Sequence, residues 1–430
     1  MDSFEFEKQI GIETFFTDSK GLGGKLKYDP NDFIVDENFI YPDKKESGDY
    51  LIAEVSSRNW ETNTLIREIS NRLHVSRKRI SFAGTKDKRA VTTQLMSFYK
   101  IPKENLRNLK IKDVKIKNIY ESDTQIRLGD LKGNSFKIKI RNLEDTNKKD
   151  IETIKNQILK IKGFPNFYGY QRFGITRPVN HVIGKHIIKG EFEKAVMCYI
   201  GNPIKGEYED IFELRKELEE TRDYSYAFKK YPDYLIFEKS ILNKLINNPL
   251  DFSGALLELP KNLLIMFINS YQSYLFNKIL SRRILNKIPL NEAVIGDTIY
   301  PKNKNIIEER QIPVSSRNID KVNTQIKKNK AVVTGVLYGY ESQISEGIIG
   351  KIEGQVIKAE KIKKQEFIVP EIPFLSSRGS RRHILSQLDD IKYSLNKKSK
   401  ELILEFKLDK GCYATSLLRE FMKSNVISNY

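Results

Sequence analysis

The run NSFKIKIRNL, at residues 134–143, alternates between apolar and polar side chains, strictly so from 135 to 141. Alternation of this kind predicts a β-strand that buries only one of its faces. Other candidate elements precede and follow it: strands at 49–59, 79–84 and 91–99, and helices at 62–76 and 148–163. The first 160 residues therefore predict a mixture of helices and antiparallel strands, which is an α+β pattern.

The sequence changes character after about residue 185. From there to residue 290 it is mostly helical in pattern, and the stretch 261–284 is apolar on much of its circumference. Such a stretch predicts a largely buried helix. Short β-like runs with Gly and Lys return between 290 and 375.

The last 55 residues resemble the first part of the chain again, because SKELILEFKLDKGCYATSLLREFMKS predicts a strand, a tight turn and a helix. A strand of this kind would complete the N-terminal sheet. We therefore predict one α+β domain with a mixed or antiparallel sheet, built from residues 1–188 and 376–430. An α+β domain at 189–375 would be inserted into it.

The 430-residue chain carries 74 Lys and Arg against 56 Asp and Glu, which gives a net charge of +18. A surplus of this size favours a polyanionic partner such as nucleic acid, although a general lysine-rich bias gives the same total. Two distant cysteines, Cys198 and Cys412, predict no disulfide framework and an intracellular, cytoplasmic protein. The N-terminus lacks the apolar core of a signal peptide, and no run approaches the roughly 18 apolar residues of a membrane span.

Metal and nucleotide motifs are missing from the sequence. Its four histidines form no H-x-x-x-H or H-E-x-x-H pattern, and no CxxC occurs. The glycine-rich KGLGGKLKYDP at 20–30 departs from the phosphate-loop pattern G-x-x-x-x-G-K-[ST]. We therefore expect chemistry by side chains alone, without a metal or another cofactor.

One acid, Asp87, lies among Lys86, Lys88 and Arg89 in the stretch SFAGTKDKRAVTTQ. Neighbouring cations keep a carboxylate ionised, and an ionised carboxylate can act as a nucleophile that forms a covalent intermediate. The alternative is a solvated hairpin turn in which Asp87 is a counter-ion, and this run alone favours that alternative. The flanking strands and Gly84, which permits an unusual backbone entry, favour a rigidly held turn.

Aromatic residues crowd the stretch GFPNFYGYQRFG at 163–174, around Asn166, Gln171 and Arg172. Amides suit the edges of nucleobases and flat rings suit their faces, but a loop that anchors itself in the core has the same composition. The stretch DKGCYATSLLREF predicts a helix capped by Thr415 or Ser416, whose N-terminus would suit a phosphate.

Five stretches in this chain resemble the signature motifs of the TruD family of tRNA pseudouridine synthases, in the family's order. They are DPNDFIVDE, FAGTKDKRAVTTQ, RLGDLKGNSF, PNFYGYQRFG and GCYATSLLRE, and they span residues 29–420. The middle of the chain matches weakly, and its length is similar to that of archaeal and eukaryotic members.

The resemblance implies isomerisation of uridine to pseudouridine in tRNA, with uridine 13 of the D arm as the usual target and no cofactor. It implies that Asp87 is the catalytic aspartate and that Phe33, Asn166 and Tyr413 line the uridine pocket. Tyr168 would add a stacking ring, in an order swapped relative to the family's usual Tyr-Phe. The late motif has Tyr413 where the family often has Phe.

Three further expectations accompany this interpretation. Lys86 or Arg89 would pair with Asp87, and the excess cations would bind the tRNA backbone. The inserted domain would clamp the tRNA through basic runs that include Lys327, Lys328 and Lys330.

Two alternatives are an RNA-binding protein without activity on the same fold and a metal-dependent nuclease. The nuclease would use carboxylates such as Asp389 and Asp390, but it needs an acid cluster that the sequence does not reveal.

Overall fold

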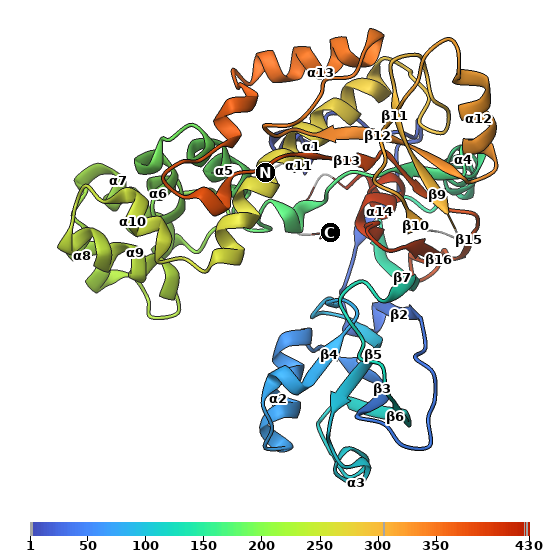
Figure 1. The fold of residues 1–430 in the computed structure, drawn as a ribbon, viewed down its shortest axis with the longest axis horizontal. Coiled ribbons are helices and arrows are strands. Elements are labelled where there is room, and N and C mark those ends of the chain that lie inside the picture. Colours follow the sequence, from blue (N-terminus) through green and yellow to red (C-terminus); the bar gives the residue numbers. More distant parts are fainter. Residues whose placement is uncertain (1–2, 304–305, 425, 427–428) are drawn as a thin grey trace. The chain divides into compact units, whose positions relative to one another are not determined.

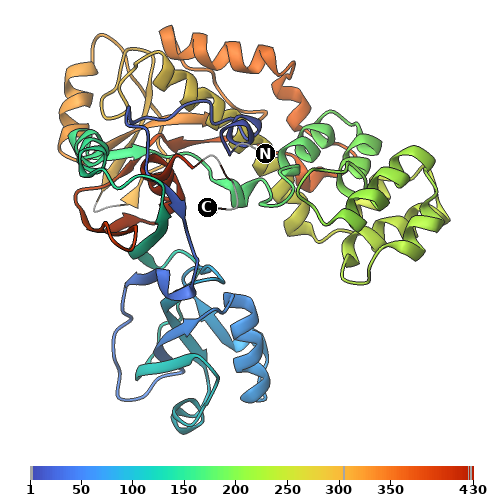
Figure 2. The same ribbon diagram turned by 180° about the vertical axis from the view of Figure 1, so that it is seen from behind.

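The computed structural model describes residues 3–303, 306–424, 426 and 429–430, and the chain forms two compact units (Figures 1 and 2). The helical unit comprises Met1–Phe16 and Pro165–Leu385, and the sheet unit comprises Thr17–Phe164 and Ser386–Tyr430. The sheet unit is thus built from an N-terminal and a C-terminal segment of the chain. The predicted domain boundaries at 188 and 375 stay a prediction.

The sheet unit contains, within its described residues, a nine-stranded sheet of order β15-β16-β7-β2-β5-β3-β6, with β1 paired to β7 and β4 to β5. Its strands are β1 Gly23–Lys25, β2 Phe33–Phe39, β3 Tyr50–Arg58, β4 Ile80–Phe82, β5 Val91–Tyr99, β6 Val114–Ser122, β7 Leu131–Leu143, β15 Ile391–Asn396 and β16 Glu401–Asp409. The β2–β5 pair is parallel and the other pairs are antiparallel. The predicted mixed sheet of an α+β fold is confirmed.

The C-terminal strand completes the N-terminal sheet, as the sequence predicted. Strand β16 pairs with β7, and Leu404 lies opposite Ile138 in the register. Both side chains are buried, because the alternation of β7 directs its isoleucines to one face and its lysines to the other. Helices α4 (Lys148–Lys160) and α14 (Ala414–Met422) contribute apolar side chains to the same core.

A second core lies at the other end of the sheet, under helix α2 (Thr62–Arg72) and helix α3 (Lys103–Arg107). Leu65 and Ile69 of α2 pack there with side chains of β3 and β5. We call α2, α3 and strands β3 to β6 the α2–α3 lobe. It forms the end of the sheet unit opposite β15 (Figures 1 and 2).

Helix α11 (Lys261–Leu285) is the centre of the helical unit, and it is buried along most of its length, as the apolar stretch predicted. The other helices are α1 Ser3–Gln9, α5 Asn180–Ile188, α6 Phe192–Ile200, α7 Glu209–Thr221, α8 Tyr224–Lys230, α9 Ile236–Asn247, α10 Phe252–Leu257, α12 Ile319–Lys327 and α13 Gly347–Ala359. A small sheet contains β9 Thr298–Asn303, β10 Ile306–Ile307, β11 Ile312–Pro313, β12 Ala331–Leu337 and β13 Ser380–His383. The short strands β8 (Gly163–Pro165) and β14 (Leu385–Gln387) lie where the chain passes between the units.

Among the described helices, none has both the length and the apolar character required to cross a membrane.

Candidate active site

The loop that carries Asp87 connects β4 to β5 and is tied to the rest of the sheet unit by two hydrogen bonds just before the aspartate. The backbone oxygen of Ala83 accepts from the N–H of Gly129 at 2.8 Å. The N–H of Lys86 donates to the hydroxyl of Thr62, the first residue of α2, at 2.8 Å. The loop is thus longer than the predicted hairpin turn, and these bonds, rather than an unusual backbone at Gly84, hold it, because Gly84 has no positive φ.

Lys86 points into the protein, where its ammonium lies 2.7 Å from a Glu37 oxygen and 3.0 Å from the amide oxygen of Asn134. Glu37 and Asn134 lie directly opposite each other on β2 and β7. Both partners of the ion pair are buried, and burial raises the pKa of Glu37 while Lys86 opposes that rise. This contact corrects the expectation for Lys86, because Glu37 takes the charge that was expected to pair with Asp87.

Asp87 forms an ion pair with Lys27. The Lys27 ammonium lies 3.4 Å from an Asp87 carboxylate oxygen and 4.4 Å from the centre of the Phe33 ring. The Asp87 side chain keeps 31% of its surface exposed, so the carboxylate is accessible from solvent. Two predicted site residues that are far apart in sequence are therefore brought together by a lysine that the sequence analysis missed. Its only signal was its place just before DPNDF.

Phe33 begins β2, and its entry into the strand is fixed by two acids. Asp29 and Asp32 form a reciprocal cap on the short helix η1 (Pro30–Asp32), and the Asp32 carboxylate accepts two bonds from Arg141 at 2.8 Å. The Phe33 ring is 1% exposed and meets Phe136 edge-on at 6.4 Å. The acids of DPNDF are thus structural, and they hold the ring that faces Lys27.

Arg89 donates to the backbone oxygen of Tyr28 at 3.0 Å. Since Tyr28 follows Lys27 in the chain, this bond ties the loop of Asp87 to the segment that carries its partner. The expected pairing of Arg89 with Asp87 stays a prediction.

Tyr413 lies at the N-cap position of α14, after the turn that follows β16, and is half-buried. The register places Asp409, the last residue of β16, opposite Gly133, which precedes Asn134 on β7. The predicted cap by Thr415 or Ser416 is wrong, because the helix begins at Ala414 and no side chain caps it. Both hydroxyl residues therefore fall inside the first turn.

Asn166 lies in the helical unit and is fully buried. Its amide nitrogen donates to the backbone oxygen of His383 at 3.0 Å, and its amide oxygen accepts from Arg382 at 2.7 Å. The Arg382 guanidinium lies 4.2 Å from the centre of the Tyr168 ring. Arg382 therefore joins two predicted site residues. The sequence analysis missed it, although the cluster SRGSRRH at 377–383 was a visible signal.

The aromatic stretch 163–174 is anchored in the core. Asn277 of α11 accepts from the N–H of Tyr168 at 2.9 Å and donates to its backbone oxygen at 3.0 Å, and the Tyr168 ring meets Phe276 edge-on at 5.6 Å. The packing of this stretch is that of a loop anchored in the core, which was one of the two interpretations of its composition. A role for Asn166 and Tyr168 toward a base stays a prediction, as does the meeting of Phe33, Asn166 and Tyr413 beside Asp87.

Asp389 and Asp390, the carboxylates of the nuclease alternative, line a hollow of about 570 Å³ in the sheet unit. Lys392 and Lys407 line the same hollow among the acids. No group of three or more His, Cys, Asp or Glu in the described part of the chain is arranged to hold a metal ion. The nuclease alternative thus gains no support from this hollow.

Comparison with known proteins identifies the family. The family model described as tRNA pseudouridine synthase D (TruD) matches residues 9–421. A relative from Methanosarcina barkeri, named "Probable tRNA pseudouridine synthase D", is 43% identical over 97% of this chain and 98% of its own. A relative of the same name from Pyrococcus furiosus is 37% identical over 96% and 99%.

A solved structure of a TruD protein from Methanosarcina mazei has the same fold, with a TM-score of 0.89. It is 40% identical in sequence, and the match covers 99% of both chains. A match of this extent includes every stretch in which the candidate residues lie. The chain belongs to the TruD family of tRNA pseudouridine synthases, which are isomerases.

Proposed function

We propose that this protein converts uridine 13 in the D arm of tRNA to pseudouridine, with Asp87 as the nucleophile. The observation that carries the proposal is the contact of Lys27 with both Asp87 and Phe33. It places an accessible, charge-paired carboxylate beside an aromatic ring, on a loop tied to the sheet. Family membership supports the general reaction, and the choice of uridine 13 rests on the resemblance.

The reaction separates uridine into two fragments that have to stay in the site. The bond between N1 of uracil and C1′ of the ribose breaks, the ring turns, and C5 joins C1′, so N1 gains a proton and C5 loses one. A carboxylate that attacks the sugar or the base bonds covalently to one of the two fragments, while the pocket has to retain the other. Asp87 suits this role because its carboxylate is accessible from solvent and the Lys27 ammonium lies 3.4 Å from it on one side.

A uridine within a stem must leave the base stack before Asp87 can reach it. Phe33, Tyr168 and Tyr413 supply rings for a flipped base, and Asn166 supplies an amide for its edge. In the structure the Asn166 amide contacts Arg382 and His383. These two bonds fix the orientation of the amide group.

The direct test is to incubate the purified protein with an unmodified tRNA transcript and to map pseudouridine at each position. We expect one strong site, at position 13, in the presence and absence of a chelator. Product at another position would contradict the assignment of uridine 13, and chelator-sensitive cleavage of the RNA would favour the nuclease. Binding without product would favour the RNA-binding alternative.

A further inference from the structure

The positive charge of this chain is concentrated in one short segment. Residues 71–117 contain 14 Lys and Arg against three Asp and Glu, a net charge of +11 out of the total of +18. The other 383 residues together carry only +7. A lysine-rich composition would spread the surplus along the chain, so this concentration requires a local reason.

The charged segment lies on the surface of the α2–α3 lobe. It runs from the end of α2 through the short helix η2 (Arg77–Arg79) and α3 to β6, which is an edge strand of the sheet. Exposed cations follow this path: Arg77, Lys78, Lys110, Lys112, Lys115 and Lys117. Because these side chains point into water, they are available to phosphate groups.

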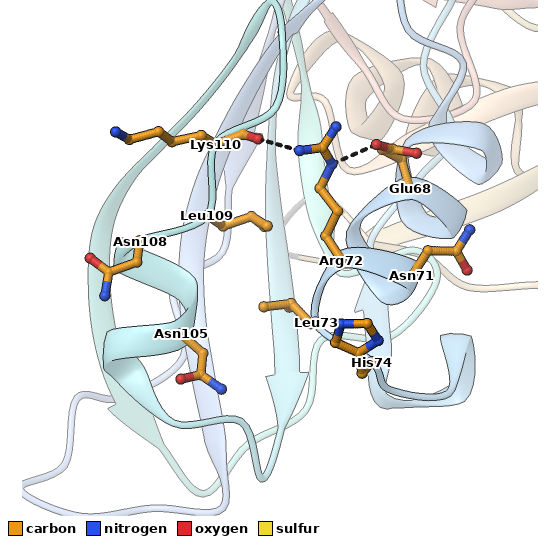
Figure 3. Close-up of a pocket in the computed structure, with 9 residues that line it drawn as sticks. All are labelled: Glu68, Asn71, Arg72, Leu73, His74, Asn105, Asn108, Leu109 and Lys110. Carbon is orange, nitrogen blue, oxygen red and sulfur yellow. Dashed lines mark hydrogen bonds and ion pairs between the residues drawn. The ribbon is translucent and has the colours of Figure 1, made fainter.

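A hollow of about 770 Å³ lies in the same lobe, between the end of α2 and the α3 segment (Figure 3). Leu73 and Leu109 point toward each other across it, and Arg72 spans it at one end, from Glu68 at 2.6 Å to the backbone oxygen of Lys110 at 2.9 Å. Arg72 thus links the two walls of the hollow by a hydrogen bond.

The rim of the hollow is rich in side-chain amides, from Asn71, Asn105 and Asn108, and His74 adds an imidazole. Within the described residues, none of these four side chains has a hydrogen-bond partner in the protein. Apolar walls, unpaired amides and a flat ring are the groups that contact the faces and edges of unstacked bases.

Helix α2 links this hollow to the catalytic loop. Its first residue, Thr62, accepts from the N–H of Lys86, and its last residue, Arg72, spans the hollow. At 1.5 Å per residue the helix covers about 15 Å. The hollow is therefore too far from Asp87 to hold the reacting uridine and lies within reach of another part of the same RNA.

We propose that the α2–α3 lobe is a second RNA-binding surface, in which the cations bind phosphates and the hollow holds an unpaired base at a distance from the target uridine. The inference rests on the proposed function for its substrate, tRNA. The alternative is that lysines on the edge strand β6 only prevent edge-to-edge association of sheets. That alternative gives the amides of the hollow no role and predicts no effect on RNA affinity.

The test compares two variants, of which one should change the salt dependence of tRNA binding and the other should not. Replacing Lys110, Lys112 and Lys115 by Gln removes three phosphate contacts. The negative slope of log affinity against log salt should therefore become shallower by about two. The double variant N105A/N108A removes base contacts and no charge. It should lower the affinity for the tRNA transcript about tenfold while leaving the salt slope unchanged.

The matched control replaces Lys397, Lys398 and Lys400 by Gln, in the exposed turn between β15 and β16 of the same unit. It should bind tRNA with nearly the wild-type slope and form product at the wild-type rate. Equal slope changes in the two lysine variants, or wild-type affinity in N105A/N108A, would overturn the proposal. Product formation by the wild-type protein is measured separately, so failure of the proposed function would appear as absence of product in every sample.

Discussion

The ammonium of Lys27 lies 3.4 Å from the Asp87 carboxylate and 4.4 Å from the centre of the Phe33 ring. Lys27 itself adopts a left-handed backbone conformation, with φ at 51°. The aspartate and its cation come from two segments that meet because β2 and β5 are parallel neighbours, with Ile34 opposite Val91. The contact therefore depends on the sheet and not on the run of charges around Asp87.

Replacing Lys27 by Met should slow pseudouridine formation at saturating tRNA by at least about tenfold, because it removes the charge that orients Asp87. K27R should retain more activity than K27M, since it keeps the charge. The measurement is the single-turnover rate together with the affinity for tRNA, and we expect the rate to change more than the affinity.

The matched control is K25M, two residues earlier, where the structure gives the lysine side chain no hydrogen bond or ion pair in the described chain. K25M should react at the wild-type rate. An unchanged rate of pseudouridine formation in K27M would show that Lys27 has no role in the reaction.

The buried pair of Glu37 and Lys86 predicts a large loss of stability when one partner is removed. Lys86→Met should lower the free energy of unfolding by about 3 kcal/mol, because it leaves a buried carboxylate without its cation. The double variant E37Q/K86M should recover part of that loss. Denaturant titration of the single and double variants measures both effects.

An exposed pair in the same sheet serves as the comparison. Lys137 and Glu405 are 2.9 Å apart, with about half of each side chain exposed. Lys137→Met should therefore cost less than about 1 kcal/mol. An equal loss of unfolding free energy in the two variants would mean that burial does not determine how much the Glu37–Lys86 ion pair stabilises the protein.

His181 predicts a pH dependence of stability in the helical unit. Burial lowers its pKa from 6.5 to about 4, so the unfolded chain binds a proton between these values while the folded chain does not. Stability should therefore fall as the pH falls from 6.5 to 4, by roughly 3 kcal/mol for this group.

His181→Phe keeps a ring against Tyr274, whose centre lies 4.9 Å from that of the imidazole, and removes the titration. The variant should lose less stability than the wild type over the same pH range. Parallel pH profiles of the unfolding free energy in the two proteins would contradict the assignment to His181.

The basic run at the end of α12 tests whether the middle of the chain also binds tRNA. Charge reversal of Lys327, Lys328 and Lys330 should weaken tRNA binding and flatten its salt dependence if this region acts as a clamp. Chemistry on saturating tRNA should change little. Unchanged affinity and salt slope would show that these lysines are solvated surface, as the 3.7 Å contact of Lys327 with Glu292 also allows.

Local patterns predicted the secondary structure well, because alternation and helical periodicity report burial directly. The strand at 134–143 lies within β7, and the apolar stretch 261–284 lies within α11. The cap of α14 was predicted wrongly, because the favourable hydroxyl residues begin one residue after the helix has started. Such an offset is set by the turn that precedes the helix and not by propensity.

The candidate site was predictable only where a motif marked it. Asp87 and Phe33 each lie in a recognisable stretch, and the structure joins them. Lys27, Glu37 and Arg382 were missed because their partners are set by strand register or by chain segments more than 200 residues apart, as for Arg382 and Asn166. A single sequence contains no direct signal of such pairs.

The central claim, that Asp87 is the nucleophile, is tested most directly by mapping pseudouridine in tRNA treated with Asp87→Asn. We predict that this variant folds, binds tRNA like the wild type and forms product at least about a thousandfold more slowly. The exposed Asp123→Asn variant of the same unit should keep full activity. Pseudouridine formed by Asp87→Asn at the wild-type rate would contradict the account.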